Sequence, residues 1–329
     1  MEYRPFGQTG LQVSAIGFGC WEMGGGYGSI EESEVIKAIH RALDLGINCF
    51  DTAEGYGKGR SEELLSKALG NRRKDVIVVT KFGVAYDDRP KGRDSRRSTA
   101  HAAIDRSLKA LNTDYVDVYL VHWPDRTTPF DETMRALEEL VQQGKVRHVG
   151  LSNFTLDEIK TCMSMRRVEV LQYSCNLFDR RMPRWIFPYA EENGIGVMTY
   201  GSLAYGLLTG AFTEETTFEE GDWRRTGGWD MSLRLFMPEV FKRNVQAVNE
   251  LKPIAERLGK KLPHLALNWT HSNPGVSVSL VGARRASEVE DNMGAVGWQL
   301  GDDVRAEIDQ VFAEYEIDTA PNKWVERVD

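Results

Sequence analysis

The fold of this chain is decided by four short stretches: Asn48-Cys49-Phe50-Asp51, Ala53-Glu54-Gly55-Tyr56-Gly57, Val78-Val79-Thr80-Lys81 and Tyr119-Leu120-Val121-His122. Three of them are apolar runs of the kind that form buried β-strands. In chain order they supply an Asp, a Tyr, a Lys and a His. Strand ends of parallel α/β folds converge on one mouth, where the chemistry is placed. We therefore predict that Asp51, Tyr56, Lys81 and His122 form one catalytic set.

Short apolar runs alternate with amphipathic stretches along the whole chain. The predicted strands are 15–19, 48–51, 76–80, 116–122, 146–152, 169–173, 196–200 and 276–281. Helical spacing of apolar residues recurs between them, as in 61–69, 98–111 and 130–143. Eight such units predict an α/β fold of the (β/α)8 TIM barrel type. A doubly wound open sheet is the alternative, but the glycine-rich turn that such folds use for dinucleotides is incomplete here.

Other segments lie outside this repeat. Residues 3–6 and 11–14, around Gly7 and Gly10, predict an N-terminal β-hairpin. Residues 302–315 predict an extra C-terminal helix followed by an irregular tail. A long loop at about 201–240 is rich in polar and aromatic residues, which is typical of a segment that covers a site. No linker composition divides the chain, so we expect a single domain over 1–329.

Composition excludes several classes of protein. The chain has 41 Lys and Arg against 49 Asp and Glu, a net charge of −8, which argues against a nucleic-acid or anionic membrane partner. Neither a secretory signal nor a transmembrane stretch is visible. The four cysteines, Cys20, Cys49, Cys162 and Cys175, are far apart, so we expect reduced thiols and a cytoplasmic location. Because His and Cys show no ligand spacing, we predict no metal site.

The chemistry of the four polar residues points to proton transfer. The pKa of a free tyrosine is about 10, too high for efficient acid–base work near neutrality. A lysine beside Tyr56 would lower that pKa, and a buried Lys81 needs a carboxylate such as Asp51 as its partner. His122 could hydrogen-bond a substrate carbonyl. Such a device suits interconversion of a carbonyl and an alcohol with hydride transfer to or from a nicotinamide.

At these residues the chain resembles the aldo-keto reductase family. The resemblance is carried by residues 50–62, Thr80-Lys81, 121–125 and 150–154, and extends from the hairpin to about Leu300. It implies a (β/α)8 barrel that binds NAD(P)H without a Rossmann motif. It also implies that Tyr56 is the general acid or base, tuned by Asp51, Lys81 and His122.

The resemblance further implies a set of cofactor contacts. Ser152, Asn153 and Gln172 match the residues that bind the carboxamide, and Tyr200 matches the aromatic residue that stacks on the nicotinamide. The full predicted set is Gly19, Cys20, Trp21, Asp51, Ser152, Asn153, Gln172, Tyr200, Gly201, Ser202, Leu203, Gly206, Leu208, Gly282, Ala283, Arg284, Glu288, Asp291 and Asn292. Arg284 and Arg285 could clamp a 2′-phosphate, whereas Glu288 could bind a free 2′-hydroxyl. Two cations outweigh one anion, so we expect NADPH, with NADH left open.

We expect the substrate to be a sugar-derived or small polar carbonyl compound, because tryptophans stack on the apolar faces of sugars. Trp21, Tyr56, His122, Trp123 and Trp229 are the predicted substrate residues. Three alternatives stay open: a sugar dehydrogenase working in the oxidative direction, a redox-sensing barrel like a channel β-subunit, and a glycosidase with paired carboxylates. Whether the chain forms a homo-oligomer is also open.

Overall fold

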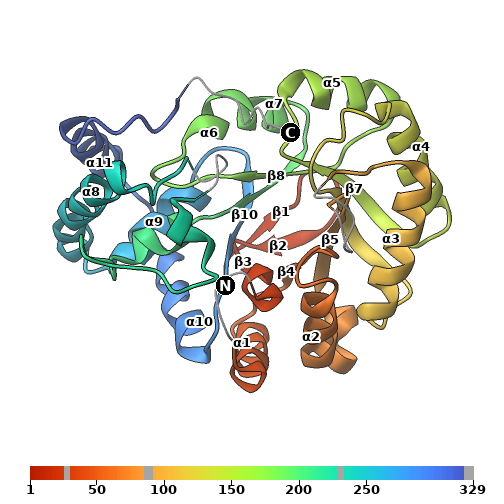
Figure 1. Cartoon of the computed structure of the whole chain (residues 1–329), viewed down its shortest axis with the longest axis horizontal. Helices are drawn as coiled ribbons and strands as arrows, with labels where there is room; N and C mark the ends of the chain where they lie inside the picture. Colours follow the sequence, from red (N-terminus) through yellow and green to blue (C-terminus); the bar gives the residue numbers. More distant parts are fainter. Residues whose placement is uncertain (26–29, 85–91, 229–232, 322–329) are drawn as a thin grey trace.

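The computed structural model describes residues 1–25, 30–84, 92–228 and 233–321. In that part of the chain, eight parallel strands close into a barrel in the order β10-β3-β4-β5-β6-β7-β8-β9 (Figure 1). They are β3 (Ile16–Gly19), β4 (Cys49–Asp51), β5 (Ile77–Phe82), β6 (Val116–Val121), β7 (Val146–Ser152), β8 (Val170–Ser174), β9 (Gly196–Tyr200) and β10 (Val276–Val281). The predicted (β/α)8 barrel is confirmed, and the ends of each predicted strand lie within two residues of the observed ones.

The barrel strands are rich in β-branched residues because both of their faces are covered. All six residues of β5 are buried, and so are all six of β6. Lys81 of β5 pairs with Leu120 of β6, and the amide of His122 donates to the carbonyl of Phe82 at 2.9 Å. This parallel register brings the carboxyl ends of successive strands to the same level. The polar residues that follow those strands therefore reach one mouth.

The helices surround the barrel and cover its outer face (Figure 1). They are α1 (Glu32–Asp44), α2 (Arg60–Leu69), α3 (Arg97–Ala110), α4 (Phe130–Gln142), α5 (Leu156–Met165), α6 (Arg181–Trp185), α7 (Phe187–Glu192), α8 (Pro238–Arg257), α9 (Leu262–His271), α10 (Ala286–Asn292) and α11 (Asp302–Glu314). In α4 the buried residues Met134, Leu137 and Leu140 share one face, as an amphipathic helix on a barrel requires. The predicted C-terminal helix is α11, which packs against α8.

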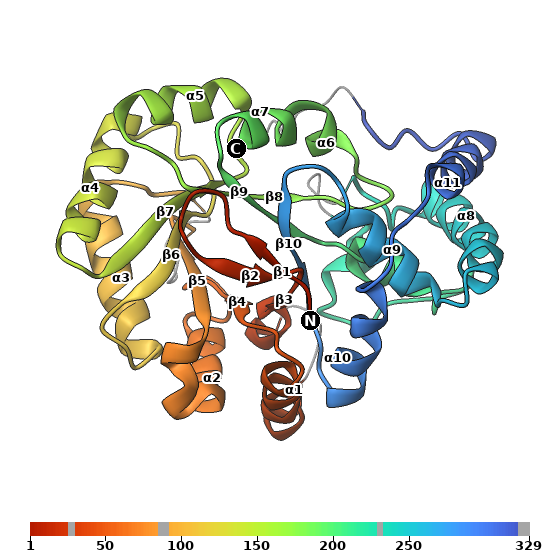
Figure 2. The ribbon, with the colours of Figure 1, turned by 180° about the vertical axis from the view of Figure 1, so that it is seen from behind.

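A hairpin covers the amino end of the barrel. Strands β1 (Tyr3–Pro5) and β2 (Gln12–Ser14) pair antiparallel, as predicted, and Figure 2 shows them lying across the barrel. Phe6 and Val13 are fully buried and pack with residues of the barrel interior. At Gly7, with φ +56°, a Cβ atom would lie 2.3 Å from the amide nitrogen of Gly196. A glycine is needed there because the hairpin approaches the start of β9 so closely.

The long segment between β9 and α8 has short helical turns of its own. These are the 3-10 helices η3 (Ala204–Thr209) and η4 (Trp223–Thr226). Further 3-10 helices are η1 (Trp21–Gly24), η2 (Gly70–Asp75) and η6 (Met293–Ala295). Trp223 is buried in the core cluster, so the tryptophan anchors this segment to the body of the protein. The segment predicted as a long loop is therefore partly ordered into short helices rather than being irregular throughout.

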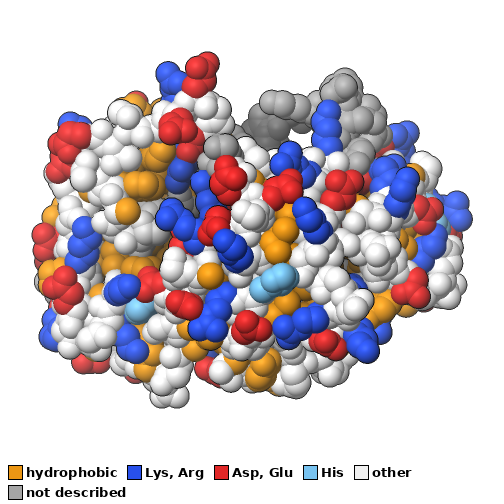
Figure 3. Space-filling view, turned by 90° about the horizontal axis from the view of Figure 1, so that it is seen from below, with side chains coloured by type: hydrophobic (Ala, Val, Ile, Leu, Met, Phe, Trp, Pro, Cys, Tyr) orange, Lys and Arg blue, Asp and Glu red, His pale blue; other side chains and the backbone are white. Residues whose placement is uncertain are grey.

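The surface mixes charges of both signs. On the face shown in Figure 3, acidic and basic side chains are interspersed, with hydrophobic side chains scattered between them. This distribution gives that face no field of a single sign. Across the described residues, no helix combines the length and the apolar character that crossing a bilayer requires. The four cysteines are buried and unpaired with one another, as expected for reduced thiols.

Candidate active site

The four predicted polar residues meet at the carboxyl end of the barrel. The Lys81 ammonium donates to Asp51 Oδ2 at 2.7 Å, to the Thr52 carbonyl at 2.8 Å and to the Tyr56 hydroxyl at 3.0 Å. Lys81 is fully buried, so each of its three donors needs a partner, and these oxygens supply them. The His122 ring lies edge-on to Tyr56, with the ring centroids 5.6 Å apart. The structure thus brings together residues that are up to 71 positions apart.

Burial changes the expected acidity of Tyr56. It raises the pKa of Tyr56 above the ordinary value, and the Lys81 ammonium offsets only part of that increase. The expectation that the pKa of Tyr56 is lowered is therefore wrong. Removing the phenolate from water destabilises it by more than the neighbouring Lys81 ammonium stabilises it. Burial also opposes the charged form of Lys81, but Asp51 and Tyr56 raise the pKa of this lysine. At neutral pH the pair consists of a neutral phenol and an ammonium.

His122 is a neutral imidazole. Burial, together with the positive charges of Lys81 and Arg93, lowers the pKa of His122 well below its usual value. In the described part of the chain, its buried Nδ1 atom has no hydrogen-bond partner. A neutral ring can orient a carbonyl oxygen by a hydrogen bond from its one N–H group, but that N–H is too weak an acid to transfer its proton near pH 7. Tyr56 is therefore the better proton donor of the two.

A hydrogen-bonded chain continues from the tetrad along the mouth. The Gln172 amide donates to Asp51 Oδ1 at 2.7 Å, and the Ser152 hydroxyl donates to the Gln172 carbonyl at 2.9 Å. Asn153 donates to Ser152 Oγ at 2.9 Å and accepts from the Tyr200 hydroxyl at 2.8 Å. Asn153 has φ +65°, an uncommon conformation that asparagine tolerates better than most residues. These bonds fix the orientation of the polar groups beside Tyr56.

These groups line a cavity of about 1400 Å³. Its lining includes most of the predicted cofactor residues: Gly19, Trp21, Asp51, Ser152, Asn153, Gln172, Tyr200, Gly201, Ser202, Leu203, Gly206, Gly282, Arg284, Glu288, Asp291 and Asn292. Cys20, Leu208 and Ala283 lie instead in the hydrophobic core. Their side chains are apolar or weakly polar, and sequence adjacency to lining residues does not tell which way a side chain points. The volume exceeds the roughly 300–1,000 Å³ of common ligand pockets, so an extended ligand and a second small one could both fit.

Aromatic side chains surround the end of the cavity near Tyr56. Trp21 and Trp123 line it, and the Trp21 ring centroid lies 6.5 Å from that of Tyr56. The Arg93 guanidinium stacks on Trp123 at 4.6 Å from the ring centroid. Trp229, also predicted to contact substrate, lies outside the described residues. Trp21 and Trp123 give this end an apolar wall suited to a small organic ligand.

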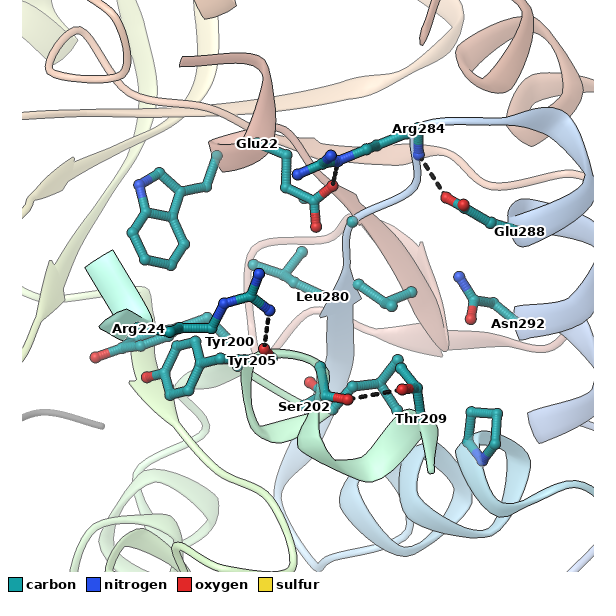
Figure 4. A pocket seen from close by; sticks show the side chains of 18 of the residues that line it. Glu22, Tyr200, Ser202, Tyr205, Thr209, Arg224, Leu280, Arg284, Glu288 and Asn292 are labelled. Atoms are coloured by element: carbon teal, nitrogen blue, oxygen red, sulfur yellow. Dashed lines mark hydrogen bonds and ion pairs between the residues drawn. The ribbon is translucent and has the colours of Figure 1, made fainter. Parts of the chain in front are cut away.

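The opposite end carries charged residues. Arg284 donates from its side chain to Glu22 at 3.1 Å and from its backbone to Glu288 at 2.7 Å (Figure 4). On the other wall, Arg224 donates to Asp222 and, at 3.0 Å, to the carbonyl of Tyr205. Arg285, Asp291 and Asn292 also line this end. Guanidinium groups in such numbers suit an anionic ligand such as a phosphate.

Several lining residues are not among the predicted cofactor or substrate residues. Glu22, Tyr205, Arg224, Lys260 and Lys261 all face the cavity. Tyr205 lies between two predicted cofactor residues, and Glu22 directly follows one, so adjacency could have suggested both. The contact between Glu22 and Arg284 joins residues 262 positions apart, and no motif signals it. Within the described ranges, no three His, Cys, Asp or Glu side chains are grouped to hold a metal ion.

Known proteins resemble this chain in sequence and in fold. Residues 15–313 match the sequence model of the Aldo/keto reductase family. The aldo-keto reductase YhdN of Bacillus subtilis is 38% identical over 95% of this chain and 94% of its own length. The NADH-specific methylglyoxal reductase of Escherichia coli is 30% identical over 92% of this chain and 95% of its own length. The solved structure of a glycerol dehydrogenase from Gluconobacter oxydans aligns with a TM-score of 0.86 at 32% identity, covering 99% of this chain and 98% of that one.

Proposed function

The chain belongs to the aldo/keto reductase family, and we propose that it reduces an aldehyde or ketone to an alcohol with Tyr56 as general acid. The observation that carries this proposal is the contact of 3.0 Å between the Tyr56 hydroxyl and Lys81, with Tyr56 and the neighbouring His122 both lining the cavity. A nicotinamide cofactor would supply the hydride. His122 would hold the carbonyl oxygen by a hydrogen bond, and Tyr56 would pass its proton to that oxygen. Lys81, held by Asp51, would stabilise the phenolate that remains.

Two features support the reductive direction. Tyr56 is protonated at neutral pH, the state that reduction requires, and burial raises its pKa further above the ordinary value. The charged state of Lys81 stabilises Tyr56 after, rather than before, it loses its proton. The same residues could also run the oxidation of an alcohol, as the name of the structurally similar glycerol dehydrogenase indicates for that protein. Rates measured in both directions at pH 7 and pH 10 would separate the two; faster oxidation at pH 7 would count against the proposal.

The cavity also supports a nicotinamide cofactor. Ser152, Asn153 and Gln172 present amide and hydroxyl groups beside Tyr56, which suits a carboxamide. Arg284 and Arg285 at the far end suit a 2′-phosphate, so NADPH is the proposed cofactor. Glu288 lies 3.6 Å from Arg285 and offsets part of its positive charge, which weakens the argument for NADPH. One relative is also named NADH-specific. Dissociation constants for NADPH and NADH, measured by quenching of tryptophan fluorescence, would decide; equal values would refute the preference.

We further propose a small polar carbonyl substrate, such as one derived from a sugar, and a cytoplasmic location. Trp21 and Trp123 support the substrate class because aromatic rings pack against the apolar face of a sugar. A panel of aldoses, small aldehydes and purely apolar ketones would test this. Preference for the apolar ketones would contradict it.

The decisive experiment is Tyr56→Phe. We expect the variant to bind NADPH with little change and to lose carbonyl reduction by a factor of about 100 or more, because the acid is removed while the binding groups stay. Tyr189→Phe, on α7 away from the cavity, is the matched control and should keep full activity. If Tyr56→Phe retained substantial turnover, Tyr56 would not be the general acid.

A further inference from the structure

The cavity contains an acidic side chain at a place where an anion is expected to bind. Glu22, in η1 after β3, lines the cavity, and about 30% of its side chain is exposed. A Cβ atom on Gly282 would lie 2.7 Å from Glu22 Oε1, so the carboxylate lies directly against the backbone at the end of β10. Burial raises the pKa of Glu22, and the neighbouring Arg284 opposes this rise. Because this carboxylate is held in a confined position, its negative charge interacts strongly with any ligand in the cavity.

Glu22 is paired with the guanidinium group of Arg284, which an anionic ligand could also bind. Arg284 donates from Nε to Glu22 Oε2 at 3.1 Å. Figure 4 shows this pair on one wall and Arg224 on the opposite wall, with its guanidinium directed toward the space between them. Arg224 has its own carboxylate, Asp222, at 2.6 Å, and rests over the Phe218 ring. Both arginines of this section of the cavity are thus already paired with acidic side chains.

An extended dinucleotide would have to pass between these walls. Tyr56 and Asn292 line the same cavity as the residues of these walls, and Figure 4 shows Glu22 and Arg284 facing Arg224 across it. The phosphate groups of such a ligand are negatively charged and would be attracted by the two arginines. They would be repelled by Glu22, which is also bound to one of those arginines. Entry of the ligand therefore requires Arg284 to be shared or released.

We propose that Glu22 is an internal competitor of the cofactor: its carboxylate competes with the cofactor phosphates for Arg284, weakens cofactor binding and speeds cofactor release. This inference rests on the proposed function, since it takes the cavity to be the cofactor site. The Glu22–Arg284 pair links the loop after the first barrel strand to the loop after the last one. Replacement of the pair by an Arg284–phosphate contact would return an equivalent charge partner to the arginine but would leave the Glu22 carboxylate without its cation. That unpaired charge is the cost that weakens binding and speeds release.

The experiment is the isosteric variant Glu22→Gln, with Glu22→Ala as a second variant that removes the side chain's reach. NADPH and NADH dissociation constants are measured by tryptophan fluorescence, and cofactor release by stopped-flow displacement, without any substrate. We expect both variants to bind about 5- to 20-fold more tightly and to release cofactor more slowly, which is the range of one altered charge contact. A gain for both cofactors indicates the diphosphate as the competing group, and a gain for NADPH alone indicates the 2′-phosphate.

Glu290→Gln is the matched control. Glu290 also pairs with an arginine, Arg41 at 2.7 Å, but this pair lies on the surface and does not line the cavity. Its replacement should leave both constants unchanged. Weaker or unchanged binding in both Glu22 variants would overturn the proposal, and weaker binding would identify Glu22 instead as a ligand of a ribose hydroxyl. If the unaltered protein bound neither cofactor, the proposed function would fail as well, so the two failures are distinguishable.

Discussion

Glu62 is a buried carboxyl group whose ionisation should make the stability of the protein depend on pH. It lies on α2, is 1% exposed, and accepts a hydrogen bond from the Thr80 hydroxyl at 2.6 Å. Burial raises its pKa from 4.5 to about 7, with the negative charge of Glu54 contributing and Thr80 partly offsetting the rise. The perturbation is Glu62→Gln, which keeps the shape and an oxygen acceptor for Thr80 but cannot ionise.

The magnitude follows from the difference in proton binding between the folded and unfolded chains. A pKa raised by about 2.5 units corresponds to about 3 kcal/mol. Between pH 4.5 and 7 the folded protein keeps the Glu62 proton while the unfolded chain has lost it. The free energy of unfolding therefore falls as pH rises through this window, by about 3 kcal/mol in total from this one group. Below pH 4.5 both states are protonated, and the contribution of Glu62 no longer changes.

Urea unfolding at several pH values between 4.5 and 8 measures this effect. The unaltered protein should lose about 3 kcal/mol more than Glu62→Gln over that range. Glu63→Gln, an exposed neighbour on the same helix, is the control and should follow the unaltered protein. If the free energy of unfolding changed with pH in the same way for the unaltered protein and for Glu62→Gln, ionisation of Glu62 would not destabilise the folded protein. The reasoning about its burial would then be wrong.

Three further changes have defined expectations. Lys81→Met should lower kcat by about 100-fold or more, since Tyr56 loses its charged partner and Asp51 is left unpaired; near-normal kcat with an intact circular dichroism spectrum would contradict this. Gly150→Ala should lower the free energy of unfolding, measured with urea, by about 1–3 kcal/mol, because the new Cβ atom would lie 2.3 Å from Leu120 and 2.5 Å from the Val170 carbonyl oxygen. An unchanged unfolding midpoint would show that the neighbouring strands can move apart enough to accommodate the methyl group. Tyr200→Phe removes the hydrogen bond to Asn153 and should raise the cofactor dissociation constant about 3- to 10-fold; tighter binding would refute a role for that bond in ordering the site.

Much of the fold could be predicted from the sequence because barrel strands are buried on both faces. Their continuous apolar runs, such as 116–121, stand out from the amphipathic helices around them. Three of the tetrad residues could be placed for a related reason, since Asp51, Lys81 and His122 lie at the carboxyl ends of such runs, which meet at one end of the barrel. Tyr56 follows its strand by five residues, and its assignment comes from the resemblance to a family. Local pattern and tertiary position coincide at these points.

Features that depend on distant contacts could not be predicted. The Tyr56 pKa follows from how far the surrounding chain excludes water, and the sequence indicated only the charge of Lys81. The Glu22–Arg284 pair forms because the ring of strands brings its first and last loops together. Cys20, Leu208 and Ala283 face the core rather than the cavity, a choice set by backbone direction in irregular segments. Loops without period offer no rule for side-chain direction.

The placement of β3 between β4 and β10 has a consequence for how the chain is made. The carbonyl of Ala15 accepts from the amide of Ser279 at 2.9 Å, so the first barrel strand bonds to a strand that is synthesised more than 250 residues later. Until β10 has emerged, β3 has one free edge, and so does β9 on the far side of the gap. Both are open strand edges of the kind that pair with other chains. The barrel can therefore close only once residues 276–281 are available, and until then the two open edges are the places where association with other chains is expected.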